Sequence, residues 1–431
     1  MYFVYSFLLT LGVLLMSPLF VLRRGKYTEG LAQRLGGAPE VDAGGKPILW
    51  LHCVSVGETQ AARPLFQALL EAFPHYALVV STTTLTGQRL AQEMFSEQAA
   101  AVFYFPFDWA WTARRALRRV KPSAVLLMET ELWPNFLRLC RANKIPTAIV
   151  NGRLSAKSVR GYSRLHFFIS RVVNDLTLAL MQDEADASRL QSLGLPASRV
   201  HISGNIKFDL APAADEKGLA DALRARFQLA ASRPLIVAAS THAPEEKIVL
   251  EALRILRETQ PTARLLIAPR HPERFAEVAS GIEKNGWQGV RRSALPQEDD
   301  AQADVILLDT IGELRAVYSL AQLVLMGGSL TPTGGHNILE PAWAQTCIIT
   351  GPHTFNFTAI VNDFLAADAL IQLPATPENE TPAQLAAIWG ELLADAPRRH
   401  ALAANARAVL EKNRGATART IELLTPLLRH E

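Results

Sequence analysis

The sequence contains little cysteine and no dense block of charge of one sign. Its three cysteines, Cys53, Cys140 and Cys347, are odd in number and far apart, so they form neither a disulfide framework nor a CxxC metal site. The net charge is only +3 over 431 residues, without the basic block that is typical of a dedicated nucleic-acid binder. We therefore expect reduced cytosolic thiols and no nucleic-acid partner.

Motifs for metal binding and for common nucleotide chemistry are also missing. The ten histidines are scattered, and none forms HExxH or another zinc-ligand spacing. No clear DxD pair is present to hold a metal on a diphosphate. The sequence has neither GxGxxG after its first predicted strand nor the GK[ST] of a P-loop, so NAD chemistry and ATP hydrolysis are not indicated. No metal site and no organic cofactor are predicted.

An apolar segment begins the chain. Residues 2–22 carry no charge, and Arg23, Arg24 and Lys26 follow directly. About 20 apolar residues span a bilayer as a helix, so this segment is just long enough. A cleaved signal peptide is the weaker interpretation, because no Lys or Arg precedes the apolar run and no small-residue cleavage site follows it. We expect an uncleaved anchor that spans the membrane or, bent at Pro18, lies in its interface, with the rest of the chain in the cytoplasm.

Beyond this segment, short apolar runs alternate with longer helical patterns, which is typical of parallel sheets covered on both faces. The alternation stops at a polar stretch, residues 210–218, and then restarts, so an α/β protein with two doubly wound, Rossmann-like domains is predicted. The predicted parts are the anchor at 1–22, an N-terminal domain at 23–208, and a C-terminal domain at 209–431 that ends in helices. Strands are predicted at 47–54, 76–82, 123–128, 146–150, 176–181, 234–239, 263–268, 304–308, 323–326 and 347–350.

Ligands of doubly wound sheets bind beyond the carboxyl ends of the strands, and we expect the two domains to face each other across a cleft. Glu58, in the string SVGE, follows the first predicted strand, where its carboxylate could act as a base or could simply favour a helix start. Glu129 and Glu131 follow the strand at 123–128. Two carboxylates at a strand end are unusual because burying charge is costly, although one of them could cap the next helix.

Two cations fall near the expected cleft. Lys207 lies in GNIKFD at the domain boundary and could meet a phosphate or a carboxylate, although exposed lysines are common. Arg270 lies in PRHPER, directly after the strand at 263–268. Its guanidinium group could bind a phosphate through two hydrogen bonds, or it could be a surface residue of a proline-bounded turn.

Glycine-rich segments in the second half give the most specific signal. The string GGSL at 327–330 follows a predicted strand, and GGHNILEP follows at 334–341. The glycines would let backbone approach a ligand, and a helix expected to begin near Asn337 would offer amide donors to an anion, unless the loop is merely structural. Glu340 could accept hydrogen bonds from ribose hydroxyls, and the turn at 310–314 would lie beside a nucleotide base.

Taken in order, these strings resemble the 3-deoxy-D-manno-octulosonic acid (Kdo) transferases of lipopolysaccharide synthesis. The resemblance rests on LHCVSVGET, METELWPN, NGRLS, GNIKFD, a THxxEE pattern at 240–246, PRHPERF, IGEL, GGSL, GGHNILEPA and GPHTFNF, and it runs from the apolar segment almost to the C-terminus. It implies a GT-B fold and the inverting, metal-independent transfer of Kdo from CMP-Kdo to a lipid A precursor, lipid IVA, at the cytoplasmic side of the inner membrane.

The resemblance also implies roles for particular residues. Glu58 matches the catalytic base of the family, and Glu129 and Lys207 match residues that stabilise the transition state. Family members vary at the position of Ile338, which is expected to bind through its backbone. The segments that hold CMP in the family match Pro269, Arg270, Ile311, Gly312, Glu313, Asn337, Ile338, Leu339 and Glu340.

Two other functions compete with this interpretation. A GT-B transferase or epimerase that uses a UDP-sugar would need cations or a metal for the diphosphate, and competition between CMP and UDP would separate the two. A non-catalytic lipid-binding protein with the same fold would be expected to have lost Glu58, Arg270 or the GGHN string, and all three are present. The expected partners are therefore CMP-Kdo, the lipid A precursor and the membrane surface.

Overall fold

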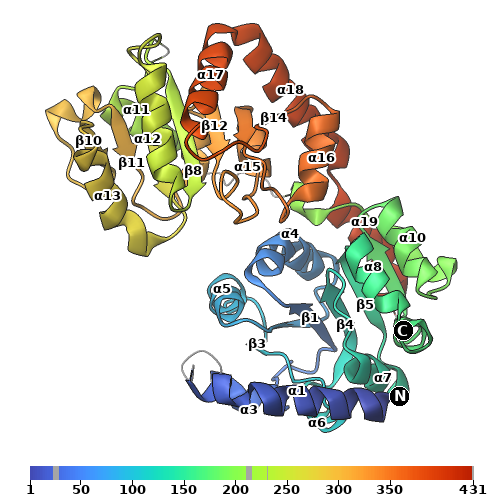
Figure 1. The fold of residues 1–431 in the computed structure, drawn as a ribbon. Coiled ribbons are helices and arrows are strands. Elements are labelled where there is room, and N and C mark those ends of the chain that lie inside the picture. The colour runs from blue at the N-terminus through green and yellow to red at the C-terminus, as the bar shows by residue number, and fades with distance from the viewer. Residues whose placement is uncertain (23–28, 210–215, 231, 430–431) are drawn as a thin grey trace. The chain divides into compact units, whose positions relative to one another are not determined.

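A computed structural model divides the chain into two compact units, which we describe separately (Figure 1). Unit 1 comprises residues 1–210 and 413–431, and unit 2 comprises residues 211–412. The structure describes residues 1–22, 29–209, 216–230 and 232–429. Arg23, Arg24 and Lys26, and the first part of the polar stretch predicted to separate the domains, lie outside the described residues.

Unit 1 is built on a seven-stranded sheet whose described strand pairs are all parallel. The strand order is β3-β2-β1-β4-β5-β6-β7, so the direction of winding reverses between β1 and β4. In doubly wound sheets, ligands bind beyond the carboxyl ends of the strands at such a reversal. The strands are β1 (Ile48–Cys53), β2 (Ala77–Thr82), β3 (Ala101–Tyr104), β4 (Pro122–Met128), β5 (Thr147–Gly152), β6 (Leu178–Met181) and β7 (Val200–Ile202).

Both faces of this sheet are apolar because helices cover both. In β1, Trp50 joins one buried cluster, while Leu49 and Leu51 join the other. This is why the central strands form continuous apolar runs in the sequence. The Leu49 face is covered by α4 (Val56–Ala72), α5 (Leu85–Phe95) and α19 (Ala416–Leu428), and the Trp50 face by α6 (Ala110–Val120), α7 (Pro134–Ala142), α9 (His166–Val173) and α10 (Glu184–Ser192). Two shorter helices, α3 (Leu31–Arg34) and α8 (Ala156–Ser163), complete the unit.

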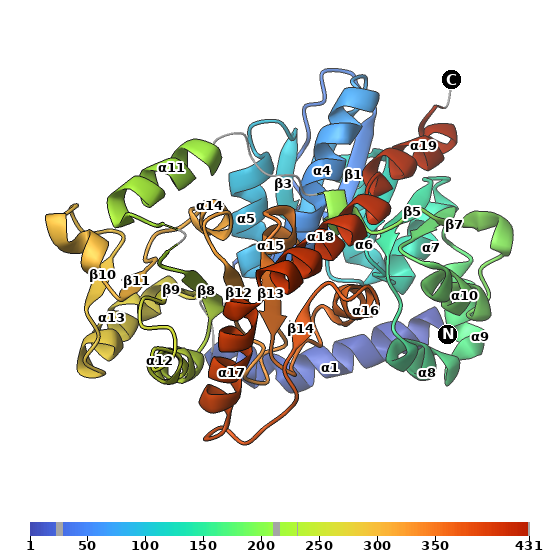
Figure 2. The same cartoon turned by 90° about the horizontal axis from the view of Figure 1, so that it is seen from above.

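The apolar N-terminal segment forms α1 (Tyr2–Leu22), which lies lengthwise along unit 1 with its start beside α7 and α9 (Figures 1 and 2). The hydroxyl group of Tyr2 donates a hydrogen bond of 2.9 Å to the Asp175 carboxylate. The ring of Tyr2 also packs edge-on against Phe168, with 5.4 Å between the ring centroids. Among the described residues, no helix is both long enough and apolar enough to cross a membrane.

The last helix, α19, belongs to unit 1, whereas the sequence predicts that it belongs to the C-terminal domain. The Tyr76 hydroxyl donates a 3.0 Å hydrogen bond to the backbone oxygen of Leu428. At the other end of the helix, the Asp209 carboxylate accepts the backbone N–H of Thr417 at 2.6 Å. The apolar side of α19 is buried against α4, so the chain returns to its first unit before it ends.

Unit 2 contains a second sheet of seven strands, again with parallel pairs. The order is β10-β11-β9-β8-β12-β13-β14, which places the reversal between β8 and β12. The strands are β8 (Leu235–Thr241), β9 (Arg264–Pro269), β10 (Gly289–Arg291), β11 (Val305–Leu307), β12 (Leu323–Met326), β13 (Cys347–Thr350) and β14 (Ile371–Gln372). The helices are α11 (Glu216–Phe227), α12 (Glu245–Leu256), α13 (Phe275–Lys284), α14 (Leu314–Tyr318), α15 (Leu339–Trp343), α16 (Thr358–Ala366), α17 (Thr381–Ala394) and α18 (Ala396–Asn413).

The predicted architecture of two parallel-sheet α/β domains is therefore confirmed. All ten predicted strands occur in the structure, and the predicted helical C-terminus corresponds to α17, α18 and α19. Four strands were not predicted, namely β3, β7, β10 and β14.

Candidate functional site

Glu58 lies on the first turn of α4, just beyond the carboxyl end of β1. One oxygen of its carboxylate accepts the backbone N–H of Val54 at 2.8 Å, and the other accepts the Ser55 hydroxyl at 3.0 Å. Only 7% of the residue is exposed. Burial, reinforced by the charges of Glu129 and Glu131, raises the pKa of Glu58 to about 7 despite these hydrogen bonds. The carboxylate therefore supports the helix start, and it also titrates near neutral pH.

Glu129 and Lys207 form an ion pair at the same edge of the sheet. Glu129 follows the last residue of β4, and Lys207 lies in the short helix η2 (Ile206–Asp209) after β7. Lys207 Nζ is 3.0 Å from Glu129 Oε1, and the two side chains are 20% and 25% exposed. Glu129 has a φ of +53°, a left-handed conformation that is uncommon for a residue with a side chain and is often found at functional sites.

Glu131 adds a third carboxylate to this group. Burial and the neighbouring charge of Glu129 raise its pKa to about 7. Glu58 and Glu131 thus titrate in the same range, so these two carboxylates are only partly charged at neutral pH. Of the three carboxylates, it is Glu129 that contacts the ammonium group of Lys207.

Asn151 was not predicted as a site residue, yet it positions the segment that carries Lys207. It is fully buried at the carboxyl end of β5 and also has a positive φ, of +55°. Its Oδ1 accepts the backbone N–H of Ile206 at 3.0 Å, and its Nδ2 has no partner among the described residues. The string NGRLS had marked this position, but its contact with residue 206 depends on the tertiary fold.

In unit 2, Glu245 holds the glycine loop that follows β12. Its side chain is fully buried and accepts the backbone N–H groups of Gly328 at 2.7 Å, Leu330 at 2.9 Å and His242 at 2.9 Å. Two amides of the GGSL loop are thus occupied by a carboxylate of the protein itself. The glycines allow this close packing, and these two amides are not available to an anion.

Glu246, the next residue, braces the PRHPER turn. Both of its oxygens accept hydrogen bonds from the Arg274 guanidinium, at 2.7 and 3.1 Å, and Thr241 Oγ1 donates to the same carboxylate at 2.8 Å. A bidentate pair of this kind fixes orientation as well as distance. It ties the turn after β9 to the start of α12, and Arg270 stands exposed on the same turn.

Three histidines from separate strings meet beside the glycine loop. The Nε2 atoms of His242 and His336 are 2.8 Å apart, and the two rings are almost parallel, at 6°. His271 packs edge-on against His242, with 5.1 Å between centroids. A Cβ atom at Gly328 would lie 3.1 Å from the His336 ring, so this approach favours glycine. No group of His, Cys, Asp or Glu side chains in the described part of the chain is placed to hold a metal ion.

The first two predicted CMP segments lie beyond β9 and β11. Pro269 ends β9, and Arg270 follows it. Ile311 and Gly312 form an exposed turn, with Ile311 80% exposed. The carboxylate of Glu313 is held by the Arg292 guanidinium at 2.9 Å, so its orientation is set inside the unit.

The third predicted CMP segment leads into α15. The helix begins at Leu339, slightly later than the predicted start near Asn337. Asn337 Oδ1 accepts the backbone N–H of Leu339 at 3.1 Å, and Ile338 is buried. Burial raises the pKa of Glu340. Glu340 also lines a cavity of about 410 Å³ between α11, α14 and α15, together with Arg315 and Trp343.

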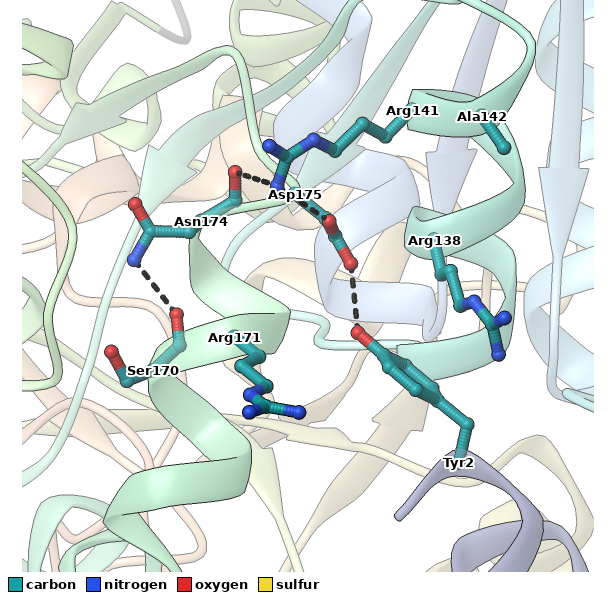
Figure 3. A pocket seen from close by; sticks show the side chains of 8 residues that line it. All are labelled: Tyr2, Arg138, Arg141, Ala142, Ser170, Arg171, Asn174 and Asp175. Atoms are coloured by element: carbon teal, nitrogen blue, oxygen red, sulfur yellow. Dashed lines mark hydrogen bonds and ion pairs between the residues drawn. The ribbon is translucent and has the colours of Figure 1, made fainter.

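A larger cavity, of about 570 Å³, lies in unit 1 beside the start of α1 (Figure 3). Arg138 and Arg141 reach it from α7, and Arg171 reaches it from α9. Arg141 pairs with Asp175 at 3.1 Å, and the Arg138 guanidinium lies 4.7 Å from the centre of the Tyr2 ring. Three guanidinium groups and one carboxylate thus line the cavity, so the charged side chains that line it carry a net positive charge.

The same architecture occurs in solved structures of distant sequence. The UDP-GlcNAc 2-epimerase of Neisseria meningitidis, bound to UDP-GlcNAc, aligns with a TM-score of 0.57 at 14% identity, and the alignment covers 88% of this chain and 100% of that chain. This likeness shows the fold alone.

Similarity in sequence is much closer to one group of enzymes. A family model described as 3-deoxy-D-manno-octulosonic-acid transferase (kdotransferase) matches residues 29–210. The 3-deoxy-D-manno-octulosonic acid transferase of Haemophilus influenzae is 34% identical over 96% of this chain and 95% of its own length, and that of Bordetella pertussis is 36% identical over 87% and 86%. The chain is a glycosyltransferase with two parallel-sheet units. It belongs to the family of 3-deoxy-D-manno-octulosonic acid transferases, as its sequence strings predicted.

Proposed function

We propose that this chain transfers Kdo from CMP-Kdo to a lipid A precursor in lipopolysaccharide biosynthesis, as an inverting GT-B glycosyltransferase that needs no metal. The observation that carries the proposal is the group at the edge of the first sheet, where Glu58 has a pKa near 7 beside the Glu129–Lys207 ion pair. A general base is most effective when its pKa lies near the working pH, so Glu58 is suited to that task.

Glu58 is the base that removes the proton of the attacking hydroxyl group. Each oxygen of its carboxylate accepts one hydrogen bond, from Val54 or Ser55, and each keeps a lone pair for an incoming proton. Inversion requires the acceptor oxygen to attack the anomeric carbon opposite the departing phosphate, as in inverting glycoside hydrolysis. The base must then take its proton from the acceptor oxygen, on the side opposite the leaving group.

Lys207 and Glu129 stabilise charge in the transition state. Their half-buried contact of 3.0 Å holds the ammonium group in place before substrate binds. A positioned charge in a poorly hydrated site acts more strongly than the same charge in water, and it needs no reorganisation during the reaction. The strained backbone at Glu129 is consistent with a side chain that is held for function.

Unit 2 holds the donor. CMP-Kdo carries a single phosphate and a sugar carboxylate, so cationic side chains such as Arg270 can stabilise the departing CMP without a metal. The turn at 311–313 and the segment at 337–340 supply the remaining contacts. Glu340 lines the cavity of about 410 Å³, and its carboxylate would accept hydrogen bonds from the ribose.

Replacing the proposed base tests this function directly. Glu58→Gln should lower turnover by about 10²–10⁴ because general-base catalysis is lost, while CMP affinity stays nearly unchanged. Turnover is measured by mass spectrometry of the lipid product, and CMP affinity by calorimetry. Glu71→Gln, an exposed change on the same helix, is the matched control and should behave as the unmodified enzyme. Near-normal turnover of Glu58→Gln, or inhibition by UDP as strong as by CMP, would contradict the proposal.

We also propose that unit 1 lies on the cytoplasmic face of the inner membrane through α1. The helix is docked through Tyr2 and through Thr10, whose hydroxyl accepts a 2.9 Å hydrogen bond from Trp109 Nε1. A helix with one docked face and one exposed apolar face fits the interface of a bilayer better than its centre. The exposed apolar residues are Phe3, Val4, Phe7, Leu8, Leu11, Leu14 and Leu15.

The arginine-lined cavity beside α1 (Figure 3) supports the same placement. Arg138, Arg141 and Arg171 would meet anionic headgroups at the level where the apolar face of α1 enters the lipid. Each basic residue close to an anionic surface contributes about 1 kcal/mol. A lipid acceptor remains in the bilayer, so an enzyme held at the surface meets it there.

Vesicle binding of the full chain tests this placement. The double variant Phe3→Ser, Phe7→Ser should bind at least about tenfold more weakly, because burying one such side chain is worth about 1.5–3 kcal/mol. Arg138→Ala with Arg171→Ala should weaken binding to anionic vesicles more than to neutral ones. Leu295→Ser, at an 81% exposed leucine of unit 2, is the control and should change neither. Unchanged binding of the Phe3, Phe7 variant would overturn the proposal.

A further inference from the structure

The contact between His242 and His336 constrains where protons lie. Two imidazole nitrogens at 2.8 Å form a hydrogen bond only when one of them carries a proton and the other does not. The neutral pair therefore shares one N–H···N bond, and each ring keeps its Nδ1 atom for another interaction. An additional proton can be taken up on the ring that donates, while the bond between the rings is retained.

The surroundings of the pair favour an anion. Burial, the neighbouring histidines and Arg270 lower the pKa of His336 to about 4, and burial and His271 lower that of His242. The carboxylates nearby are already engaged, since Glu245 accepts three backbone amides and Glu246 pairs with Arg274. The charged and titratable groups that face the pair are Arg270, His271, Arg274, Glu245 and Glu246.

Two of the segments proposed to hold CMP adjoin this group of histidines. His271 directly follows Arg270, and His336 directly precedes Asn337. A Cβ atom at Gly328 would lie 3.1 Å from the His336 ring and 3.4 Å from the His242 ring, so both rings lie close to this backbone turn. Arg270 also lowers the pKa of both rings, so this arginine and the pair lie in one neighbourhood of unit 2.

We propose that His242 and His336 together hold one proton against the phosphate of the bound donor and transfer it to that phosphate as CMP leaves. The inference rests on the proposed donor site in unit 2 and adds a proton donor for the leaving group. Burial, with the added charge of Arg270, keeps the empty pair neutral, and the negative charge of the donor opposes this effect. Binding and protonation are thereby coupled.

The proposed step balances as follows. The bond between the anomeric carbon and the phosphate oxygen breaks, and its electron pair remains on that oxygen, which takes the proton from the histidine pair. The anomeric carbon receives a new electron pair from the acceptor oxygen, whose proton passes to Glu58. Afterwards the histidine pair regains a proton from solvent, and Glu58 releases one.

Proton uptake on CMP binding is the test. At about pH 7.5 the phosphate of free CMP is a dianion, because its second pKa is about 6, so the phosphate can only release protons on binding to a cationic site. Calorimetry of the full-length enzyme with CMP, in buffers of different ionisation enthalpy, should show an uptake approaching about one proton per CMP. Binding without uptake, or with release, overturns the histidine proposal and leaves the donor site intact. Failure of CMP to bind overturns both.

Variants of the two histidines test whether the proton that is taken up on CMP binding is bound by this pair. His336→Gln and His242→Gln should each abolish the uptake, retain measurable CMP binding and lower kcat by about 10²–10⁴. Having two variants allows one to fail to fold without loss of the test. His400→Gln, at an exposed histidine on α18, is the matched control and should retain both uptake and turnover. Retained uptake in a folded His336→Gln or His242→Gln variant would assign the proton elsewhere and reject the proposal.

Discussion

At the end of β1, one carboxylate supports the backbone and has a raised pKa. Glu58 accepts the amide of Val54 and the hydroxyl of Ser55, as a helix-starting residue does, yet burial raises its pKa to about 7. An acid with a raised pKa in the folded state contributes stability that is present below its ordinary value of 4.5 and lost as the pH rises through about 7. At neutral pH, Glu58 thus lowers the free energy of unfolding, and the same raised pKa suits it to act as a base.

The raised pKa of Glu58 predicts how the activity of the enzyme depends on pH. Glu58 must be unprotonated to act as a base, so kcat/KM should rise with pH through a midpoint near 7. Burial is the main cause of the raised pKa, and the charges of Glu129 and Glu131 add to it. Glu131→Gln removes one of those charges, so the midpoint should move to lower pH.

A pH–rate profile of the Glu131→Gln variant beside the unmodified enzyme measures this shift. Glu97→Gln, at an exposed residue of the same unit, should leave the midpoint where it was. If the midpoint of the rise in kcat/KM stays fixed or moves to higher pH in Glu131→Gln, a group other than Glu58 controls that rise.

The sequence identifies a site residue when the residue belongs to a recognisable local string. It does so less well when the role of the residue depends on a contact with a distant part of the chain. Glu129 and Lys207 were both singled out from the sequence, but their ion pair joins residues 78 positions apart. Asn151 and the histidine pair were not singled out, because each acts through a partner that is distant in the sequence. A lone Asn or His in a sequence carries no sign of such a contact.

Among the secondary-structure elements, the strands that the sequence did not predict share one property. Strands β3, β7, β10 and β14 are the four edges of the two sheets. They are short and partly exposed, as the exposed residues of β7 and β10 illustrate. A central strand is buried on both faces and forms a continuous apolar run, whereas an edge strand lacks that run, so hydrophobic patterning identifies the centre of a parallel sheet and not its borders.

The glycine loop after β12 offers a test at the level of one element. Glu245→Ala would leave the backbone N–H groups of His242, Gly328 and Leu330 without their acceptor. An unsatisfied buried amide costs about 1–3 kcal/mol, so with partial relaxation we expect unit 2 to lose about 3 kcal/mol and CMP affinity to fall.

Hydrogen exchange at the amides of Gly328 and Leu330 reports on this loop directly and should accelerate in the Glu245→Ala variant. Glu251→Ala, an exposed change on the same helix, should leave exchange at the loop and CMP affinity as they were. Unaltered protection at residues 328–330 in Glu245→Ala would mean that the carboxylate does not hold the loop.

Over the whole molecule, the path of the chain explains why the last helix belongs to the first unit and not, as predicted, to the second. Apolar patterning finds the restart of the strand series, and it therefore separates the first sheet from the second. It does not reveal which sheet a later amphipathic helix covers. Helix α19 is buried against α4 and its first turn is tied to Asp209, so unit 1 is completed only by the last residues of the chain.

Two leucine substitutions test which unit is stabilised by α19 and which by α18. Leu424 on α19 is fully buried in the cluster of unit 1, and Leu402 on α18 is 1% exposed in the cluster of unit 2. Replacing a buried leucine by alanine costs about 2–5 kcal/mol, because the apolar contact is lost and a cavity remains. Leu424→Ala should therefore accelerate hydrogen exchange in β1 and β2 and leave β8 and β12 protected, and Leu402→Ala should do the reverse. If Leu424→Ala instead loosened the strands of unit 2, the final helix would support the second unit, as the order of the sequence had suggested. Because Glu58 lies on α4, which α19 covers, Leu424→Ala should also lower turnover while CMP binding persists.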